Sequence, residues 1–134
     1  MYFSIHPEAS VPIYEQIMAQ VIYGVAAGTL EAGTFIPSVR ELAEQLLVHP
    51  NTVARAFQEL ERAGVVTPRR GRGMEVTADA PKACQGLRDE LVRNRIRQAL
   101  REAAGSALGP DDIRRMVDEE LAAVNGKRRN KEGR

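Results

Sequence analysis

Apolar residues recur at helical spacing in two short segments near the middle of the chain. The first segment, residues 38–46, carries its apolar residues at Val39, Leu42, Ala43 and Leu46. The second segment, residues 50–63, carries them at Val53, Ala56, Phe57 and Leu60. This spacing predicts two amphipathic helices that each turn one face toward a core. Pro37-Ser38 gives a start signal for the first helix, and Val48-His49-Pro50 separates the two by a tight turn.

The polar face of the second predicted helix carries side chains that can recognise DNA bases. Asn51 can donate and accept along an adenine edge, and Arg55 can form a bidentate pair with guanine. Thr52 can reach a base or a phosphate. An ordinary solvated helix surface carries similar side chains, so the segment after this helix decides between the two interpretations.

Glycines and β-branched residues after the second helix predict a hairpin. Gly64 suits the end of the helix, and residues 65–67 and 74–77 have the composition of two short strands. The segment between the strands contains Arg69, Arg70, Gly71, Arg72 and Gly73. Arginines at such a tip track phosphates or enter a minor groove. Two helices followed by this hairpin predict a winged helix-turn-helix, which places its second helix in the DNA major groove.

The same stretch resembles the GntR family of bacterial transcriptional regulators, in particular its small YtrA-type branch. The shared patterns are Pro-Ser-x-Arg-x-Leu-Ala from Pro37, Pro-Asn-Thr-Val-x-Arg-Ala from Pro50 and Arg-Arg-Gly-x-Gly from Arg69. The resemblance implies DNA contacts from Arg40, His49, Asn51, Thr52, Arg55, Arg70, Gly71 and Arg72. It also implies a double-stranded DNA operator and repression of a nearby operon, often one for an ABC transporter.

Two positions depart from the family pattern. Leu47 stands where the family often has a turn glycine, so we expect a slightly different turn. His49 stands where this branch usually has Asn, and His is a poorer helix cap than Asn.

A third amphipathic helix is predicted before the motif. Ile13, Ile17, Val21 and Val25 form its apolar stripe, which would pack behind the two motif helices. We interpret Tyr14 and Tyr23 on this helix as packing groups rather than nucleic-acid stackers. The preceding residues 2–5 suggest a short strand or an arm.

Two more helices are predicted after the wing. Residues 78–81 have the composition of a hinge, a first helix covers about 83–104, and a second runs from Pro110 to a stop at Asn125-Gly126. Their apolar stripes include Leu87, Leu91, Ile96, Leu100, Ile113, Val117 and Leu121. Two such helices cannot bury both stripes against each other, so a second copy of the chain is the natural partner. The arginines at 93, 97 and 101 are interpreted as a solvated face.

The expected fold class is therefore mostly α with a small β wing, a winged helix-turn-helix followed by two C-terminal helices. We expect residues 1–78 to form the DNA-binding domain and residues 79–134 a helical dimerisation segment. The basic residues from Lys127 onward are expected to form a disordered tail, with a solubilising role favoured over nonspecific DNA affinity.

Net charge is only +1, which is low for a DNA-binding protein, but the charge is unevenly spread. Residues 1–36 contain no Lys or Arg, whereas arginines gather in the second helix and the wing. Local clustering matters more for groove binding than the total. The single cysteine, Cys84, excludes an internal disulfide, and a small buried apolar role is favoured over an intermolecular redox bridge.

No arrangement of residues indicates catalysis, a metal site or a cofactor. The two histidines lack ligand spacing, and the chain has no phosphate-binding Gly-Lys loop. Because such arrangements are missing, we expect a protein that is not an enzyme. No apolar run is long enough to cross a membrane, so we expect it to be cytoplasmic. The alternative is a winged-helix module that binds a protein partner. The polar recognition face and the arginine wing favour DNA. Whether an effector ligand exists is not predicted.

Overall fold

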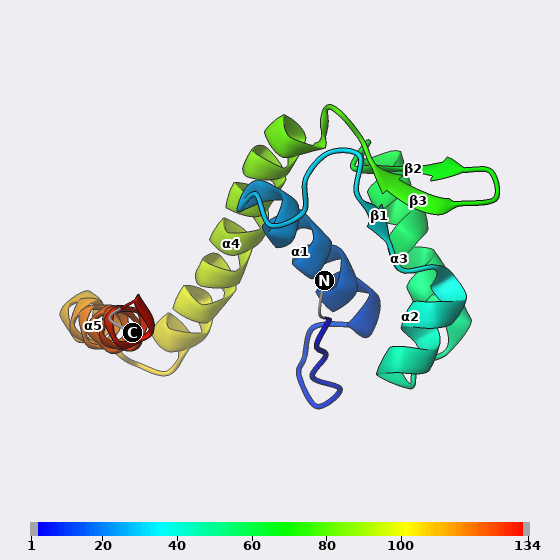
Figure 1. The fold of residues 1–134 in the computed structure, drawn as a ribbon. Helices are drawn as coiled ribbons and strands as arrows, with labels where there is room; N and C mark the ends of the chain where they lie inside the picture. The colour runs from blue at the N-terminus through cyan, green and yellow to red at the C-terminus, as the bar shows by residue number, and fades with distance from the viewer. Residues whose placement is uncertain (1–2, 133–134) are drawn as a thin grey trace. The chain divides into compact units, whose positions relative to one another are not determined.

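The computed structural model describes residues 3–132, and of residues 129–132 it describes the backbone alone. Its helices and strands are α1 (Ile13–Ala26), β1 (Phe35–Ile36), α2 (Val39–Leu46), α3 (Pro50–Arg62), β2 (Val66–Arg69), β3 (Gly73–Val76), α4 (Ala80–Gly105) and α5 (Pro110–Glu132), shown in Figure 1. The described chain is mostly helical with one small antiparallel sheet, which confirms the predicted fold class. It divides into two compact units, Met1–Leu91 and Val92–Arg134.

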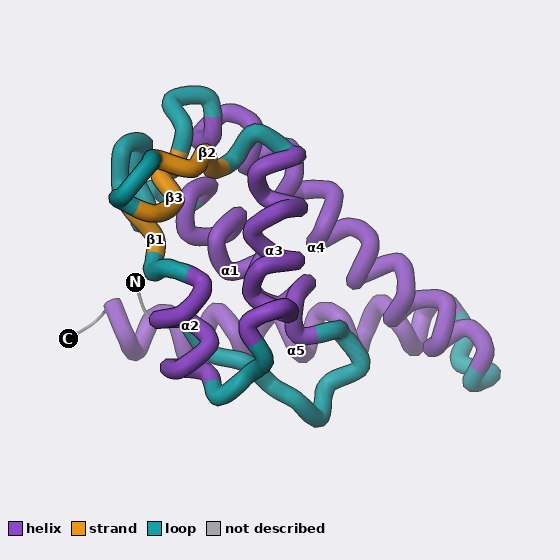
Figure 2. The backbone as a smooth tube through the Cα atoms, turned by 90° about the vertical axis from the view of Figure 1, so that its right-hand side faces the viewer, coloured by secondary structure: helices purple, strands orange, loops and turns teal. Residues whose placement is uncertain are grey.

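The core of the first unit lies where α1 and α2 pack on α3 (Figure 2). The predicted stripe of α1 is buried at Ile17, Val21 and Val25, and α3 buries Val53, Ala56, Phe57 and Leu60. Leu42 of α2 is fully buried beside them. Helical spacing of apolar residues therefore identified this core correctly.

Both motif helices begin or end with the signals that the sequence carries. Ser38 caps α2, because its hydroxyl oxygen accepts a hydrogen bond of 3.1 Å from the backbone N–H of Glu41. At the end of α3, Gly64 adopts a φ of 79°, which a residue without Cβ takes at little cost. The next backbone N–H, that of Val65, donates to the Leu60 carbonyl at 2.9 Å and closes the helix end.

The wing is the hairpin formed by β2 and β3, and its tip extends beyond the helices in Figure 1. Val66 pairs with Val76 and Arg69 with Gly73, so the turn at the tip is residues 70–72. A third strand, β1, pairs with β3 through Phe35 opposite Glu75 and gives the order β1-β3-β2. This strand was not predicted from the sequence, because two residues are too few to show an alternating pattern.

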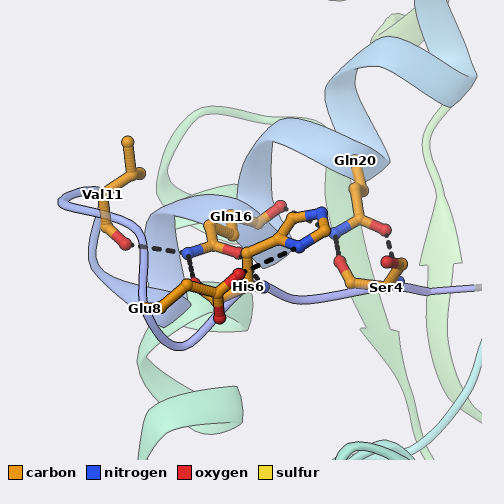
Figure 3. Close-up of polar contacts among 6 residues, drawn as sticks. All are labelled: Ser4, His6, Glu8, Val11, Gln16 and Gln20. Carbon is orange, nitrogen blue, oxygen red and sulfur yellow. Dashed lines mark hydrogen bonds and ion pairs between the residues drawn. The ribbon is translucent and has the colours of Figure 1, made fainter.

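The segment before α1 is an arm held by two glutamines (Figure 3). The Gln16 side chain, only 9% exposed, accepts from the His6 backbone N–H at 2.8 Å and donates to the carbonyls of His6 and Val11. The Gln20 side chain bonds the backbone N–H and carbonyl of Ser4 in the same way. Phe3 is buried in the core, so the arm belongs to the first unit. No strand forms in this segment among residues 3–12, and Tyr2 lies outside the described residues.

The predicted hinge after the wing is wrong in its extent. Helix α4 already begins at Ala80, and its first turns belong to the first unit. Ala80 and Cys84 are fully buried in the core, and Leu87 and Leu91 pack against it. Burial raises the pKa of the Cys84 thiol, as expected for a cysteine with an apolar packing role. The units divide after Leu91, which differs from the expected boundary after residue 78.

The predicted stop at Asn125-Gly126 is also wrong. Helix α5 continues through both residues to Glu132, so the backbone of residues 127–132 is helical and not a disordered tail. One internal glycine costs a helix only about 1 kcal/mol relative to alanine, and the following Lys and Arg are good helix formers. The loop at residues 106–109 separates α4 from α5, in agreement with a predicted first helix that ends near 104 and a second that begins at Pro110. No described helix is both long enough and apolar enough to cross a membrane.

Candidate nucleic-acid interface

The turn between α2 and α3 is built around Leu47. This residue adopts a φ of 55° and a ψ of 46°, the left-handed conformation that a glycine would take more easily. The Val48 backbone N–H then donates to the Ala43 carbonyl at 3.1 Å and closes α2. The side chain of Leu47 is 91% exposed. The turn therefore keeps the tight geometry of the motif although its residue type differs.

The start of α3 is capped by His49. Its Nδ1 accepts a hydrogen bond of 3.0 Å from the backbone N–H of Asn51. A neutral imidazole with an accepting Nδ1 carries its proton on Nε2, which leaves that N–H free to donate. Pro50 occupies the first helical position, where its missing N–H costs nothing. His49 thus caps α3 at the position where this branch usually has Asn, and the residue is exposed.

The outward face of α3 presents the predicted base-reading side chains. Asn51 and Arg55 are exposed on the side of the helix that faces away from Val53 and Leu60, and Thr52 is half-buried at the edge of that side. The Arg55 guanidinium carbon lies 3.8 Å from the centre of the Tyr14 ring on α1. A contact this short is a cation–π stack. Tyr14 also packs against the core, as predicted, but its contact with Arg55 was not predicted, since sequence spacing does not relate residues on different helices.

Arg40 lies on the first turn of α2 with its side chain 90% exposed. Its Nε pairs with Glu44 one turn later at 3.4 Å. An exposed pair of this kind contributes little stability. The guanidinium of Arg40 can therefore exchange Glu44 for a phosphate at low cost.

The arginines of the wing differ in their surroundings. Arg69 Nε donates to Glu75 Oε2 at 2.5 Å across the hairpin, so its charge is already paired. Arg70 and Arg72 flank Gly71 in the exposed turn, and Gly71 adopts a φ of 77°. The Arg72 guanidinium carbon is 5.9 Å from the Phe35 ring centre, at the outer limit of a cation–π contact. The two tip arginines are the wing charges best placed for phosphates.

The wing tip and the start of α2 together line one groove of about 600 Å³ in the first unit. Gly71 and Arg72 line it from the wing, and Ser38 and Glu41 line it from α2. The eight predicted DNA-contacting residues thus come from α2, the turn, α3 and the wing of one compact unit. Among the described residues, no cluster of His, Cys, Asp and Glu could hold a metal ion.

The residues predicted to mediate dimerisation fall into two groups. Leu87 and Leu91 pack against the core of the first unit and so already have a partner within the chain. Ile113 is half-buried, and the remaining four are exposed: Ile96, Leu100, Val117 and Leu121. Val92, Met116 and Val124 add further exposed apolar surface to the same helices. Within the described part of the second unit, this surface is not covered.

The sequence is similar to bacterial transcriptional regulators over the proposed interface and beyond it. Residues 13–76 match the family model described as bacterial regulatory proteins, gntR family. The chain is 32% identical over 126 residues to the HTH-type transcriptional repressor YtrA of Bacillus subtilis, a match that covers 94% of this chain and 97% of the relative.

Solved structures of GntR-family regulators are similar to this structure over most of the chain. A GntR family transcriptional regulator from Listeria monocytogenes superposes with a TM-score of 0.68 at 31% identity, over 84% of this chain and 97% of that one. YtrA from Sulfolobus acidocaldarius, a GntR-family transcription factor, gives a TM-score of 0.55 at 32% identity, over 92% and 99% of the two chains. The similarity therefore extends beyond the winged helix into the C-terminal helices.

Proposed function

The chain belongs to the GntR family of bacterial regulatory proteins and is a DNA-binding transcriptional regulator, and on that premise we propose that it represses transcription by binding a two-fold operator as a homodimer. Repression is supported by the similarity to the YtrA repressor, which covers nearly the full length of both chains. We propose that the protein acts in the cytoplasm without cofactor or catalysis. The ABC-transporter operon implied by the family resemblance stays a prediction.

One observation carries the assignment of the DNA-binding face. Arg40, His49, Asn51, Thr52 and Arg55 come from consecutive elements of a helix-turn-helix, and the exposed tip Arg70-Gly71-Arg72 belongs to the same unit. In this fold the second helix enters the major groove and reads base edges, while arginines at a wing tip track phosphates or enter the minor groove. We infer that Asn51 and Arg55 read bases and that Arg40, Arg70 and Arg72 bind phosphates.

We propose that the exposed apolar residues of the second unit form the dimer interface. The candidates are Val92, Ile96, Leu100, Met116, Val117, Leu121 and Val124, together with the half-buried Ile113 on the same stripe of α5. A two-fold dimer uses the same surface on both copies, and it requires an operator with two-fold related half-sites. Leu87 and Leu91 are assigned to the core of the first unit instead, because they pack there within one chain.

The first experiment selects DNA duplexes from a random-sequence pool with the full-length protein. We expect an inverted repeat whose half-sites are separated by about one helical turn or a multiple of it. The variant Arg55→Ala should lose about 1–3 kcal/mol of discrimination at one base pair of each half-site. Equal affinity of wild type and Arg55→Ala for the selected duplex would remove the recognition-helix assignment.

The second experiment tests the dimer with Leu100→Glu and Leu121→Glu in the full chain. Each places a charge on a proposed buried interface, so we expect a monomer by sedimentation and weaker binding to the selected duplex. Arg115→Glu, on the side of α5 opposite the apolar stripe and at an exposed polar position, is the matched control and should stay dimeric. Dimeric Leu100→Glu and Leu121→Glu proteins would overturn the proposed interface and leave the DNA-binding face untouched.

A further inference from the structure

Tyr14 and Arg55 form a close contact between a helix outside the motif and a proposed base-reading side chain. Tyr14 lies in the first turn of α1, and Arg55 lies in the second turn of α3. The guanidinium carbon is 3.8 Å from the ring centre, within van der Waals contact of the ring face. Tyr14 is half-buried and packs against the core, and this packing holds its ring in place.

The phenol of Tyr14 is directed to its own helix. Its hydroxyl donates to Glu15 Oε1 at 3.1 Å and is not the group that meets Arg55. The contact with Arg55 therefore depends on the ring face alone. A phenylalanine at the same position would keep that face and lose only the hydroxyl.

Stacking fixes an arginine without using its hydrogen-bond donors. A free arginine side chain populates many rotamers and loses that freedom when it binds a base. A guanidinium lying on a ring is held by its flat face, so its N–H groups remain available at the edge. The bidentate pair with guanine needs those N–H groups in one plane. A stacked Arg55 is thus partly ordered before it meets DNA.

We propose that Tyr14 is a positioning residue that orders Arg55 for base recognition. The inference rests on the proposed function, in which Arg55 enters the major groove. It extends the recognition site onto α1, a helix that the helix-turn-helix motif does not include. Asn51, by comparison, projects from the first turn of α3 next to the capped helix start, so its position is set by the backbone.

A packing role and a positioning role predict different couplings. A tyrosine that only packs would change stability, and any effect on DNA affinity would persist whatever stands at position 55. A tyrosine that acts through Arg55 loses its effect on affinity once the guanidinium is removed. The two roles are separated by a double-mutant cycle.

The experiment measures affinity for the duplex selected by the full-length wild-type protein. Tyr14→Leu should weaken binding about two- to fivefold, the range expected for an exposed cation–π contact. It should also relax preference at the same base pair as Arg55→Ala. Tyr14→Phe should bind like wild type. In the Arg55→Ala background, Tyr14→Leu should have no further effect, whereas in the Arg70→Ala background it should keep its full effect.

Tyr14→Met guards against a folding defect, because a flexible side chain of similar volume fills the same space. Its expected affinity and coupling are those of Tyr14→Leu. Unchanged or tighter binding by folded Tyr14→Leu or Tyr14→Met overturns the inference, as does an equal loss in the Arg55→Ala background. If Arg55→Ala alone binds like wild type, the proposed role of Arg55 fails and this inference fails with it. If Arg55→Ala is weakened and Tyr14→Leu is not, this inference fails alone.

Discussion

The backbone of Leu47 is strained, and its exposed side chain contributes little to packing. Its left-handed conformation costs roughly 1–2 kcal/mol for a residue with a Cβ, and the side chain is 91% exposed. Glycine removes that cost but gives the unfolded chain about 0.4–1 kcal/mol of extra entropy. Leu47→Gly should therefore raise the free energy of unfolding by about 0.5–1 kcal/mol in urea denaturation. Leu47→Ala keeps the Cβ and is the control. Equal free energies of unfolding for Leu47→Gly and Leu47→Ala would contradict the claim that the backbone at this position is strained.

His49 stabilises α3 through its cap. His49→Ala leaves the Asn51 N–H without its acceptor, which should lower the free energy of unfolding by about 0.5–2 kcal/mol. His49→Asn supplies another acceptor and should match or exceed the wild-type stability. Thermal unfolding of the three proteins without DNA measures this directly. A His49→Ala protein as stable as wild type would show that the cap contributes nothing.

Residue types at turns and caps were predictable because each performs a local task. Ser38, Pro50 and Gly64 all take the roles that their types favour. The stack of Arg55 on Tyr14 was not predictable, since it depends on how α1 packs on α3. The Arg69–Glu75 pair was not predictable either, because it depends on the register of β2 and β3 and not on sequence spacing alone.

At the scale of elements, apolar periodicity predicted the five helices of the described residues, whereas glycines and β-branched residues predicted β2 and β3. It failed for β1, whose two residues form a strand only because β3 lies beside them. It also failed at the end of α5, where Asn125-Gly126 was given more weight than the helix-forming residues around it. Breaker residues indicate where a helix can end, and the flanking residues decide whether it does.

The wing provides a test with a matched control on one hairpin. Arg70→Ala and Arg72→Ala should each weaken binding similarly across sequences and lower the slope of log affinity against log salt by about 1. Arg69→Ala should lower the slope less, because Glu75 already neutralises that guanidinium. Titrations at several salt concentrations, on the selected duplex and on an unrelated one, measure both effects. Equal slopes for all three variants would contradict the different roles assigned to these arginines.

At the scale of the whole molecule, the sequence predicted two parts but not where one core ends. Residues 78–81 resemble a linker by composition, whereas the buried side chains of Ala80 and Cys84 continue the core into α4. The end of a folded unit in the sequence depends on which neighbouring surface the apolar stripe of a helix packs against. The stripe of α4 begins on the first unit, at Leu87 and Leu91, and continues as the exposed residues from Val92 onward.

The last prediction follows from this continuity and compares two truncated chains. A chain ending at Thr77 loses two fully buried residues and the Leu87 and Leu91 contacts, so it should be at least about 2 kcal/mol less stable than a chain ending at Leu91. The longer chain should unfold cooperatively, because it keeps the complete core of the first unit. It should sediment as a monomer, because the proposed dimer surface is removed. Urea denaturation followed by circular dichroism gives both midpoints, and equal midpoints would show that the start of α4 does not belong to the core.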